Sequence, residues 1–221
     1  MLNVTAQSTY LAIQQARAFR NLGCDWLMVL PPFVAAPSPD DVVRHLRAVL
    51  AAVPVPHILQ YSAALTGVRL SGDQLLGLRR DFPHFRSIKV DFIPPGPMVT
   101  RLRELFDEGE FTYLIGYSGL QLPDAMRRGA HGLMGGAGHA PEDLKVFRAL
   151  EQTLEGPGLD AFHRLLPLLN FEMQTIDTAV AVQKRILLER GIITSEHVRA
   201  PGHNLDRYQL EELHGHLARL A

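Results

Sequence analysis

Residues 26–30 read Trp-Leu-Met-Val-Leu, and two prolines, Pro31 and Pro32, follow at once. An unbroken apolar run, without the alternation of a half-exposed strand, is typical of a strand buried on both faces. Strands of that kind occur in parallel sheets whose two faces are covered by helices. The stretch therefore predicts that this protein is built on a parallel α/β sheet.

The same unit of a strand, a short loop and a helix recurs along the chain. Four further stretches have strand character, at residues 57–61, 87–90, 111–115 and 131–134. Helical spacing or capping residues mark residues 7–22, 40–52, 71–80, 98–106, 120–128 and 141–154. Alternating strands and helices predict a parallel sheet, which either a doubly wound fold or a (β/α) barrel would satisfy.

The pattern changes after Gly158. Residues 159–191 read as two helices with no strand between them, and residues 208–220 read as a last helix. We therefore predict two domains: the βα repeats in residues 1–157 and a C-terminal helical extension in residues 158–221.

Composition excludes several classes of protein. The chain has 221 residues and a net charge of −1, which gives no sign of a nucleic-acid or anionic-membrane partner. Cys24 is the single cysteine, so no internal disulfide can form. The N-terminus has no signal-peptide pattern, and the longest apolar run is too short to span a bilayer. We expect a soluble, cytoplasmic protein.

Lys89 is the first candidate for chemistry. The chain has only three lysines, Lys89, Lys145 and Lys184, so its basic side chains are mostly arginine. Lys89 stands at the end of the strand predicted at residues 87–90, just before a Pro-Gly-Pro loop. A lysine at the end of a buried strand can lose its proton by desolvation and act as a nucleophilic amine. An ordinary strand-end lysine that reaches solvent is the simpler interpretation.

Neighbouring strand ends add polar groups. Gln60 ends the preceding strand, and residues 116–119 (Gly-Tyr-Ser-Gly) follow the next one. Because active sites of parallel α/β folds lie at the carboxyl ends of the strands, we expect these groups to meet near Lys89. Asp91, two residues beyond Lys89, would share its strand face. A loop cap is the role that we expect for Asp91, ahead of a catalytic one.

The glycine-rich segment at residues 132–138 (Gly-Leu-Met-Gly-Gly-Ala-Gly) leads into a predicted helix. A glycine loop at a helix N-terminus can hold a phosphate or a carboxylate, but this spacing fits no nucleotide-binding motif. We expect a tight turn, and keep a phosphate-binding barrel that uses Gly135 to Gly138 as a third hypothesis of function. The ten histidines form no recognisable ligand set, so we predict no metal site.

Taken together, a series of short motifs resembles the dihydrodipicolinate synthase / N-acetylneuraminate lyase family of class I aldolases. The motifs are, in chain order, Leu30-Pro31-Pro32-Phe33, Ser38-Pro39, Pro56-His57-Ile58-Leu59-Gln60, Thr66-Gly67, Ile88-Lys89, Gly116 to Gly119, Arg128-Gly129-Ala130-His131-Gly132, Arg190-Gly191-Ile192-Ile193 and Arg199-Ala200-Pro201. The likeness runs along essentially the whole chain.

The resemblance implies a TIM barrel with extra C-terminal helices, assembled as a homodimer or homotetramer. It implies that Lys89 forms a Schiff base with pyruvate or another 2-oxo acid, with no cofactor besides that covalent imine. The site that we expect on this basis has Lys89 and Gln60 in catalysis. It has further residues at the substrate, namely Tyr61, Thr66, Gly116, Tyr117 and Met134.

Two positions depart from the family pattern. Gln60 stands where members carry the tyrosine that relays protons, and Leu65 stands where they carry an arginine that binds the substrate carboxylate. Glutamine does not titrate, so Gln60 can orient a water but cannot act as a general acid. Tyr61 could replace the relay only if the strand register shifted by one residue. Synthesis of dihydrodipicolinate itself is therefore not expected.

The family's first portion, with a loop that holds the 2-oxo acid carboxylate, has no match before Asn3. We therefore expect a (β/α)8-type barrel lacking roughly its first three strands, from a fragment or a late-start gene model. The predicted function is a Schiff-base lyase, either an aldolase or a dehydratase, acting on pyruvate or a 2-keto-3-deoxy sugar acid. The alternative is a degenerate member that binds a 2-oxo acid or serves as an interaction subunit.

Overall fold

A computed structural model describes residues 1–220, which pack as two compact units. The first unit comprises Met1–Gly116 and Arg128–His131. The second comprises Tyr117–Arg127 and the chain from Gly132 onward. No helix among the described residues is both long and apolar enough to cross a membrane.

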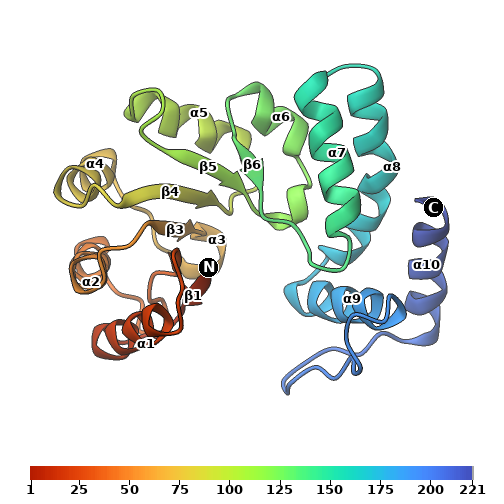
Figure 1. The fold of residues 1–221 in the computed structure, drawn as a ribbon, viewed down its shortest axis with the longest axis horizontal. Helices are drawn as coiled ribbons and strands as arrows, with labels where there is room; N and C mark the ends of the chain where they lie inside the picture. Colours follow the sequence, from red (N-terminus) through yellow and green to blue (C-terminus); the bar gives the residue numbers. More distant parts are fainter. Residues whose placement is uncertain (221) are drawn as a thin grey trace. The chain divides into compact units, whose positions relative to one another are not determined.

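The first unit is a parallel sheet with its connecting helices (Figure 1). Its strands are β1 (Leu2–Val4), β2 (Leu27–Val29), β3 (His57–Tyr61), β4 (Phe85–Val90) and β5 (Thr112–Ile115). Its helices are α1 (Thr9–Asn21), α2 (Pro39–Ala52), α3 (Ala63–Thr66), α4 (Gly72–Asp81) and α5 (Gly96–Leu105).

The strand order decides between the two folds that the sequence allows. Each strand from β1 to β4 pairs in parallel with the next strand of the chain, so neighbours among β1 to β5 are consecutive in the sequence. A doubly wound sheet would reverse its order at a switch point. The sequential order is that of a (β/α) barrel, as the family resemblance implies.

Local sequence explains why these elements form where they do. All three residues of β2 are buried, as expected for the apolar run at residues 26–30. The side chain of Ser38 accepts a hydrogen bond from the backbone N–H of Asp41 at the start of α2. Ser71 and Gln74 form a reciprocal capping box at the start of α4. These caps satisfy backbone donors that the first helical turn leaves free.

Two elements of the first unit were not predicted from the sequence. β1 pairs with β2 through Leu2 and Leu27, so a strand precedes the first predicted helix. The described residues therefore contain six strands in place of the five predicted. The prediction missed it because three residues with Asn3 in the middle show no strand pattern. The short helix α3 was also missed, since four residues are too few for helical spacing to be visible.

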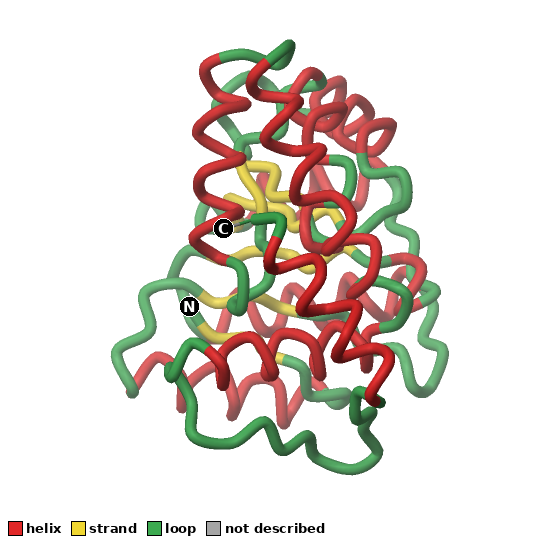
Figure 2. The backbone as a smooth tube through the Cα atoms, turned by 90° about the vertical axis from the view of Figure 1, so that its right-hand side faces the viewer, coloured by secondary structure: helices red, strands yellow, loops and turns green. Residues whose placement is uncertain are grey.

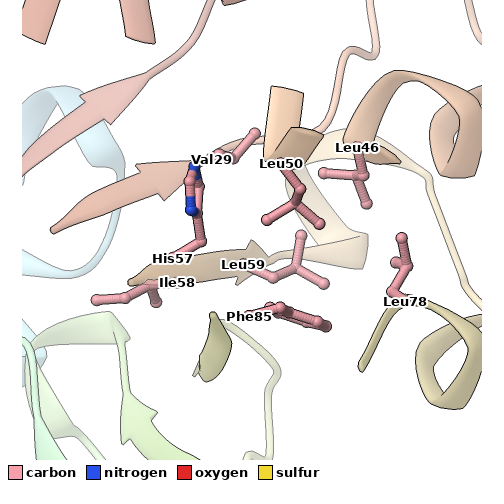
Figure 3. Close-up of a pocket in the computed structure, with 8 residues that line it drawn as sticks. All are labelled: Val29, Leu46, Leu50, His57, Ile58, Leu59, Leu78 and Phe85. Carbon is pink, nitrogen blue, oxygen red and sulfur yellow. The ribbon is translucent and has the colours of Figure 1, made fainter. Parts of the chain in front are cut away.

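Figure 3 shows how the helices of the first unit pack on the sheet. Leu46 and Leu50 of α2 and Leu78 of α4 point toward the side chains of β3. They leave a cavity of about 10 Å³, roughly the space of one water. His57 lines this cavity, with its Nδ1 2.6 Å from the carbonyl oxygen of Val55. Burial lowers the pKa of His57 to about 4. The side chain is therefore a neutral core residue.

The second unit is mainly helical (Figures 1 and 2). It contains the turn η1 (Tyr117–Gly119), α6 (Leu122–Arg127), β6 (Gly132–Leu133), α7 (Ala140–Gln152), α8 (Pro157–Glu172), α9 (Ile176–Glu189) and α10 (Arg207–Ala218). α8 packs against α7, α9 and α10. The last three helices occur where the sequence predicts a helical extension. A domain boundary at residue 157 stays a prediction, because compact packing does not define where a barrel ends.

A buried charged cluster holds the second unit together. His139 lies between two carboxylates, with Nδ1 2.9 Å from Asp143 of α7 and Nε2 3.0 Å from Glu172 of α8. His139 and Glu172 are fully buried. Burial alone would lower the pKa of His139, but hydrogen bonds and charge from Asp143 and Glu172 outweigh it and raise it to about 10. An imidazolium shared by two acids therefore joins α7 to α8.

The first unit should lose stability in mild acid. Because the pKa of His57 falls from an ordinary value of 6.5 to about 4, the unfolded chain binds a proton between these values and the folded chain does not. The free energy of unfolding should therefore fall with decreasing pH in this window, by about 1.4 kcal/mol per pH unit. Fluorescence of Trp26, the single tryptophan, measures this unfolding in denaturant.

His57→Leu should reduce this slope, whereas His163→Gln, at an exposed site, should keep it. An unchanged slope in His57→Leu would show that groups other than His57 cause the pH dependence.

The His139 cluster should have the opposite pH dependence. Its folded pKa lies above the unfolded value, so its contribution is complete below about pH 6.5 and is lost as the pH rises toward about 10. His139→Gln should cost roughly 3–5 kcal/mol at pH 6, because two buried carboxylates then face each other without a cation. The difference from the unmodified chain should shrink by pH 9. Denaturant unfolding followed by far-UV circular dichroism tests this, and a pH-independent difference would contradict it.

Candidate active site

The carboxyl ends of β1, β3 and β4 bring polar side chains of the first unit together. Gln60 and Lys89 are direct partners in the register between β3 and β4, so both side chains emerge on the same face of the sheet. The next pair in the register, Tyr61 and Val90, points to the opposite face. The register thus selects Gln60 over Tyr61 as the neighbour of Lys89.

Asp91 connects the two. Its Oδ2 lies 3.3 Å from Nζ of Lys89 and accepts a hydrogen bond of 2.9 Å from Nε2 of Gln60. The backbone N–H of Asp91 donates to the carbonyl of Tyr61, so strand pairing continues one residue beyond β4 and keeps Asp91 on the face of Lys89. We expected Asp91 to cap a loop, but its carboxylate contacts the amine.

Asn3 of β1 completes the row. Its Nδ2 donates a hydrogen bond of 3.0 Å to Oε1 of Gln60. Because this contact fixes the orientation of the Gln60 amide, Nε2 of Gln60 faces Asp91 and donates to it. The result is a chain of contacts, Asn3–Gln60–Asp91–Lys89, which we call the polar row. Asn3 was missed as a site residue because β1 was missed. Sequence spacing offered no signal that a residue 57 positions before Gln60 would touch it.

The polar row is largely buried, but solvent still reaches part of it. The side chain of Asp91 is 7% exposed and that of Lys89 is 16% exposed. Asp91 Oδ1 is buried and has no hydrogen-bond partner among the described residues. A partly exposed amine beside a buried carboxylate is a suitable arrangement for nucleophilic chemistry on a small molecule.

Gly116, directly after β5, lies against the polar row, where only a small residue fits. A Cβ placed on it would overlap Asp91 Oδ1 and would lie 3.1 Å from Cε of Lys89. Only glycine leaves room for both side chains at this point. Its predicted place beside Lys89 therefore agrees with the geometry, and its role toward a substrate stays a prediction.

Other predicted substrate residues lie elsewhere or have structural partners. The hydroxyl of Tyr61 accepts a hydrogen bond from the backbone N–H of Leu70 and donates to its carbonyl oxygen. Burial raises the pKa of Tyr61, so this side chain is a neutral core group. The hydroxyl of Thr66 donates to the carbonyl oxygen of Ser62 and is buried. Tyr117 and Met134 belong to the second unit, where Tyr117 opens the turn η1 with a φ of +48°.

The glycine loop of the second unit is occupied by the protein's own side chains. The backbone N–H of Gly138 donates to Oε1 of Gln183, and Gln183 also fills the space beside Gly136. The carboxylate of Asp143 lies against Gly135. A carboxylate at this position would repel a bound phosphate, so the geometry favours the tight turn over the phosphate site.

Cavity size does not locate this site. The cavity of Figure 3 is lined by apolar core residues and His57, and a larger hollow of about 540 Å³ lies between the start of α1 and α2. Neither is lined by Lys89. We give the polar row more weight, because it combines a partly exposed amine with a buried carboxylate. Among residues 1–220, no group of three or more His, Cys, Asp or Glu side chains is arranged to hold a metal ion.

Comparison with known proteins settles the family. The model of the dihydrodipicolinate synthetase family matches residues 1–220. The chain belongs to this family. It is 26% identical over 204 residues to an uncharacterized DapA-like lyase of Thermofilum pendens, a match that covers 90% of this chain and 66% of that protein. It is 30% identical over 141 residues to a 4-hydroxy-tetrahydrodipicolinate synthase of Corynebacterium aurimucosum, covering 62% of this chain and 44% of that protein.

Solved structures of the family share the fold. The dihydrodipicolinate synthase of Rhodopseudomonas palustris superposes with a TM-score of 0.88 at 24% identity, over 99% of this chain and 74% of that one. The enzyme of Methylacidiphilum fumariolicum gives 0.87 at 23% identity, over 99% and 71%. The fold is therefore that of a TIM barrel over the part of these structures that the chain covers. The chain spans about two thirds or less of the two curated relatives described above.

Gly116→Ala tests the close contact in the polar row. The added methyl group must displace Asp91 or the end of β5, which should destabilise the first unit by roughly 1–3 kcal/mol and disturb the Lys89–Asp91 pair. Gly77→Ala is the matched control, because a Cβ on Gly77 in α4 meets nothing within 4 Å and should stabilise the helix by about 0.5–1 kcal/mol. Trp26 fluorescence in denaturant compares the two; equal effects would show that the contact is not tight.

Proposed function

We propose that this protein is a Schiff-base-forming lyase, an aldolase or a dehydratase, that acts on a 2-oxo acid such as pyruvate or a 2-keto-3-deoxy sugar acid. The observation that carries the proposal is the amine of Lys89, which stands partly exposed at the carboxyl end of β4 beside Asp91. Membership of the dihydrodipicolinate synthetase family supports it. The reaction needs no cofactor besides the imine on Lys89.

The chemistry follows from the amine. Nζ of Lys89 attacks the 2-oxo carbon, and loss of water gives a protonated imine. The imine withdraws electrons from the neighbouring carbon, which permits either cleavage of a carbon–carbon bond or elimination of water. Gln60 cannot supply a proton, so its role is to orient a water or a substrate hydroxyl.

The substrate is proposed only as a class. Relatives named 4-hydroxy-tetrahydrodipicolinate synthase exist, but Gln60 and Leu65 replace a tyrosine and an arginine that the family pattern expects. Leu65 is 48% exposed and provides no charge for a substrate carboxylate. These replacements favour a substrate other than that of the dihydrodipicolinate enzymes.

Assembly and location are further parts of the proposal. We propose a homodimer or homotetramer in the cytoplasm, supported by the family and by a single cysteine. One solved relative is a monomeric dihydrodipicolinate synthase variant. Sedimentation at several protein concentrations gives the assembly directly.

Trapping of the imine tests the activity. Incubation with pyruvate and borohydride should attach a reduced adduct to Lys89, located by mass spectrometry of peptides. Lys89→Met should abolish the adduct, whereas Lys145→Met, at an exposed site, should retain it. Saturable binding of pyruvate without an adduct would instead favour the catalytically degenerate alternative.

A further inference from the structure

We propose that Asp91 is the proton-transfer residue of the Lys89 amine, taking the part that the tyrosine relay takes in the family pattern. This inference rests on the proposed function, since it concerns the formation of the same imine. The observation behind it is the direct contact of 3.3 Å between Asp91 Oδ2 and Lys89 Nζ.

Imine formation requires a group that moves protons at the amine. An ammonium group has no lone pair and must lose a proton before it can attack a carbonyl carbon. The hydroxyl of the resulting carbinolamine must then gain a proton before it can leave as water. In the polar row, Gln60 and Asn3 carry only amides, which do not titrate near neutral pH. Asp91 is the member of the row that can perform both transfers.

The position of Asp91 fits both transfers. Oδ2 is already within reach of Nζ, so it can accept a proton from the ammonium group and leave the neutral amine. The amine then adds to the 2-oxo carbon, and a proton moves from nitrogen to the new oxygen. Protonated Asp91 donates its proton to that hydroxyl, which departs as water. The products are the iminium ion and the Asp91 carboxylate, so protons and charge balance.

The neighbouring side chains position this carboxylate but leave one of its oxygens without a hydrogen-bond donor among the described residues. Gln60 donates one hydrogen bond to Oδ2, while Oδ1 has no donor among the described residues. A carboxylate with several fixed donors would be a poor proton acceptor. After the reaction the carboxylate stays next to the iminium nitrogen, where its negative charge stabilises the new positive charge.

Asn3 and Gly116 are positioning residues in this account. Asn3 fixes the orientation of the Gln60 amide, so that its NH2 group faces Asp91. Gly116 leaves the space that Oδ1 occupies. The hydrogen bond from Gln60 and the space beside Gly116 therefore hold the Asp91 carboxylate next to Lys89. A residue that only capped a loop would not need these contacts.

The experiment measures how fast the imine forms. The full chain is mixed with pyruvate and cyanoborohydride, samples are quenched at increasing times, and the fraction carrying an adduct on Lys89 is read by mass spectrometry. Asp91→Asn should slow adduct formation at least about 100-fold, the usual range for loss of a general acid–base group. Asp25→Asn, at a side chain 88% exposed, is the matched control and should react at the unmodified rate.

A second variant separates proton transfer from structure. Asp91→Ala should be equally slow, and added formate should restore part of the rate by supplying a small carboxylate in the vacated space. Circular dichroism and Trp26 fluorescence establish which variants are folded. Rescue by formate in folded Asp91→Ala supports the role of Asp91.

Three results would count against these proposals, and they can be told apart. An adduct that forms at the unmodified rate in folded Asp91→Asn or Asp91→Ala would overturn the role of Asp91 and leave the proposed function intact. A slow, folded Asp91→Ala variant that formate does not restore at any concentration would also count against proton transfer. Absence of any adduct in the unmodified chain would instead contradict the proposed function.

Discussion

The register between β3 and β4 is the constraint on which the site depends. It places Gln60 beside Lys89 and turns Tyr61 to the opposite face of the sheet. There the hydroxyl of Tyr61 forms hydrogen bonds with the backbone of Leu70. Because side chains alternate along a strand, a shift by one residue would exchange Gln60 for Tyr61 and separate Asp91 from its amide partner. The buried apolar side chains of these strands oppose such a shift. Packing of the core therefore determines which polar side chains are neighbours at the strand ends.

Much of the fold could be predicted from the sequence. The apolar run at residues 26–30 and the serine caps at Ser38 and Ser71 are local signals, and the elements that they predict are present. β1 could not be predicted, because its three residues are held as a strand by pairing with β2 and not by their own pattern. The choice of a barrel over a doubly wound sheet needed the family resemblance or the strand order.

The site was predicted less completely than the fold. Lys89 and Gln60 follow from the rule that strand ends meet, and the structure places them as neighbours. Asp91 was assigned a different role, since sequence alone does not show that pairing continues one residue past β4. Long-range contacts of this kind, like that of His139 with Glu172, depend on packing between distant segments. Motifs therefore located Lys89 as the candidate nucleophile, and only the structure located the carboxylate that contacts its amine.

The central claim is that the amine of Lys89 forms an imine with a 2-oxo acid. Carbon NMR with pyruvate labelled at its carbonyl carbon observes that bond without a reductant. We expect an imine carbon resonance in the unmodified chain that is lost in Lys89→Met. A spectrum that shows only free pyruvate at saturating concentration would contradict it.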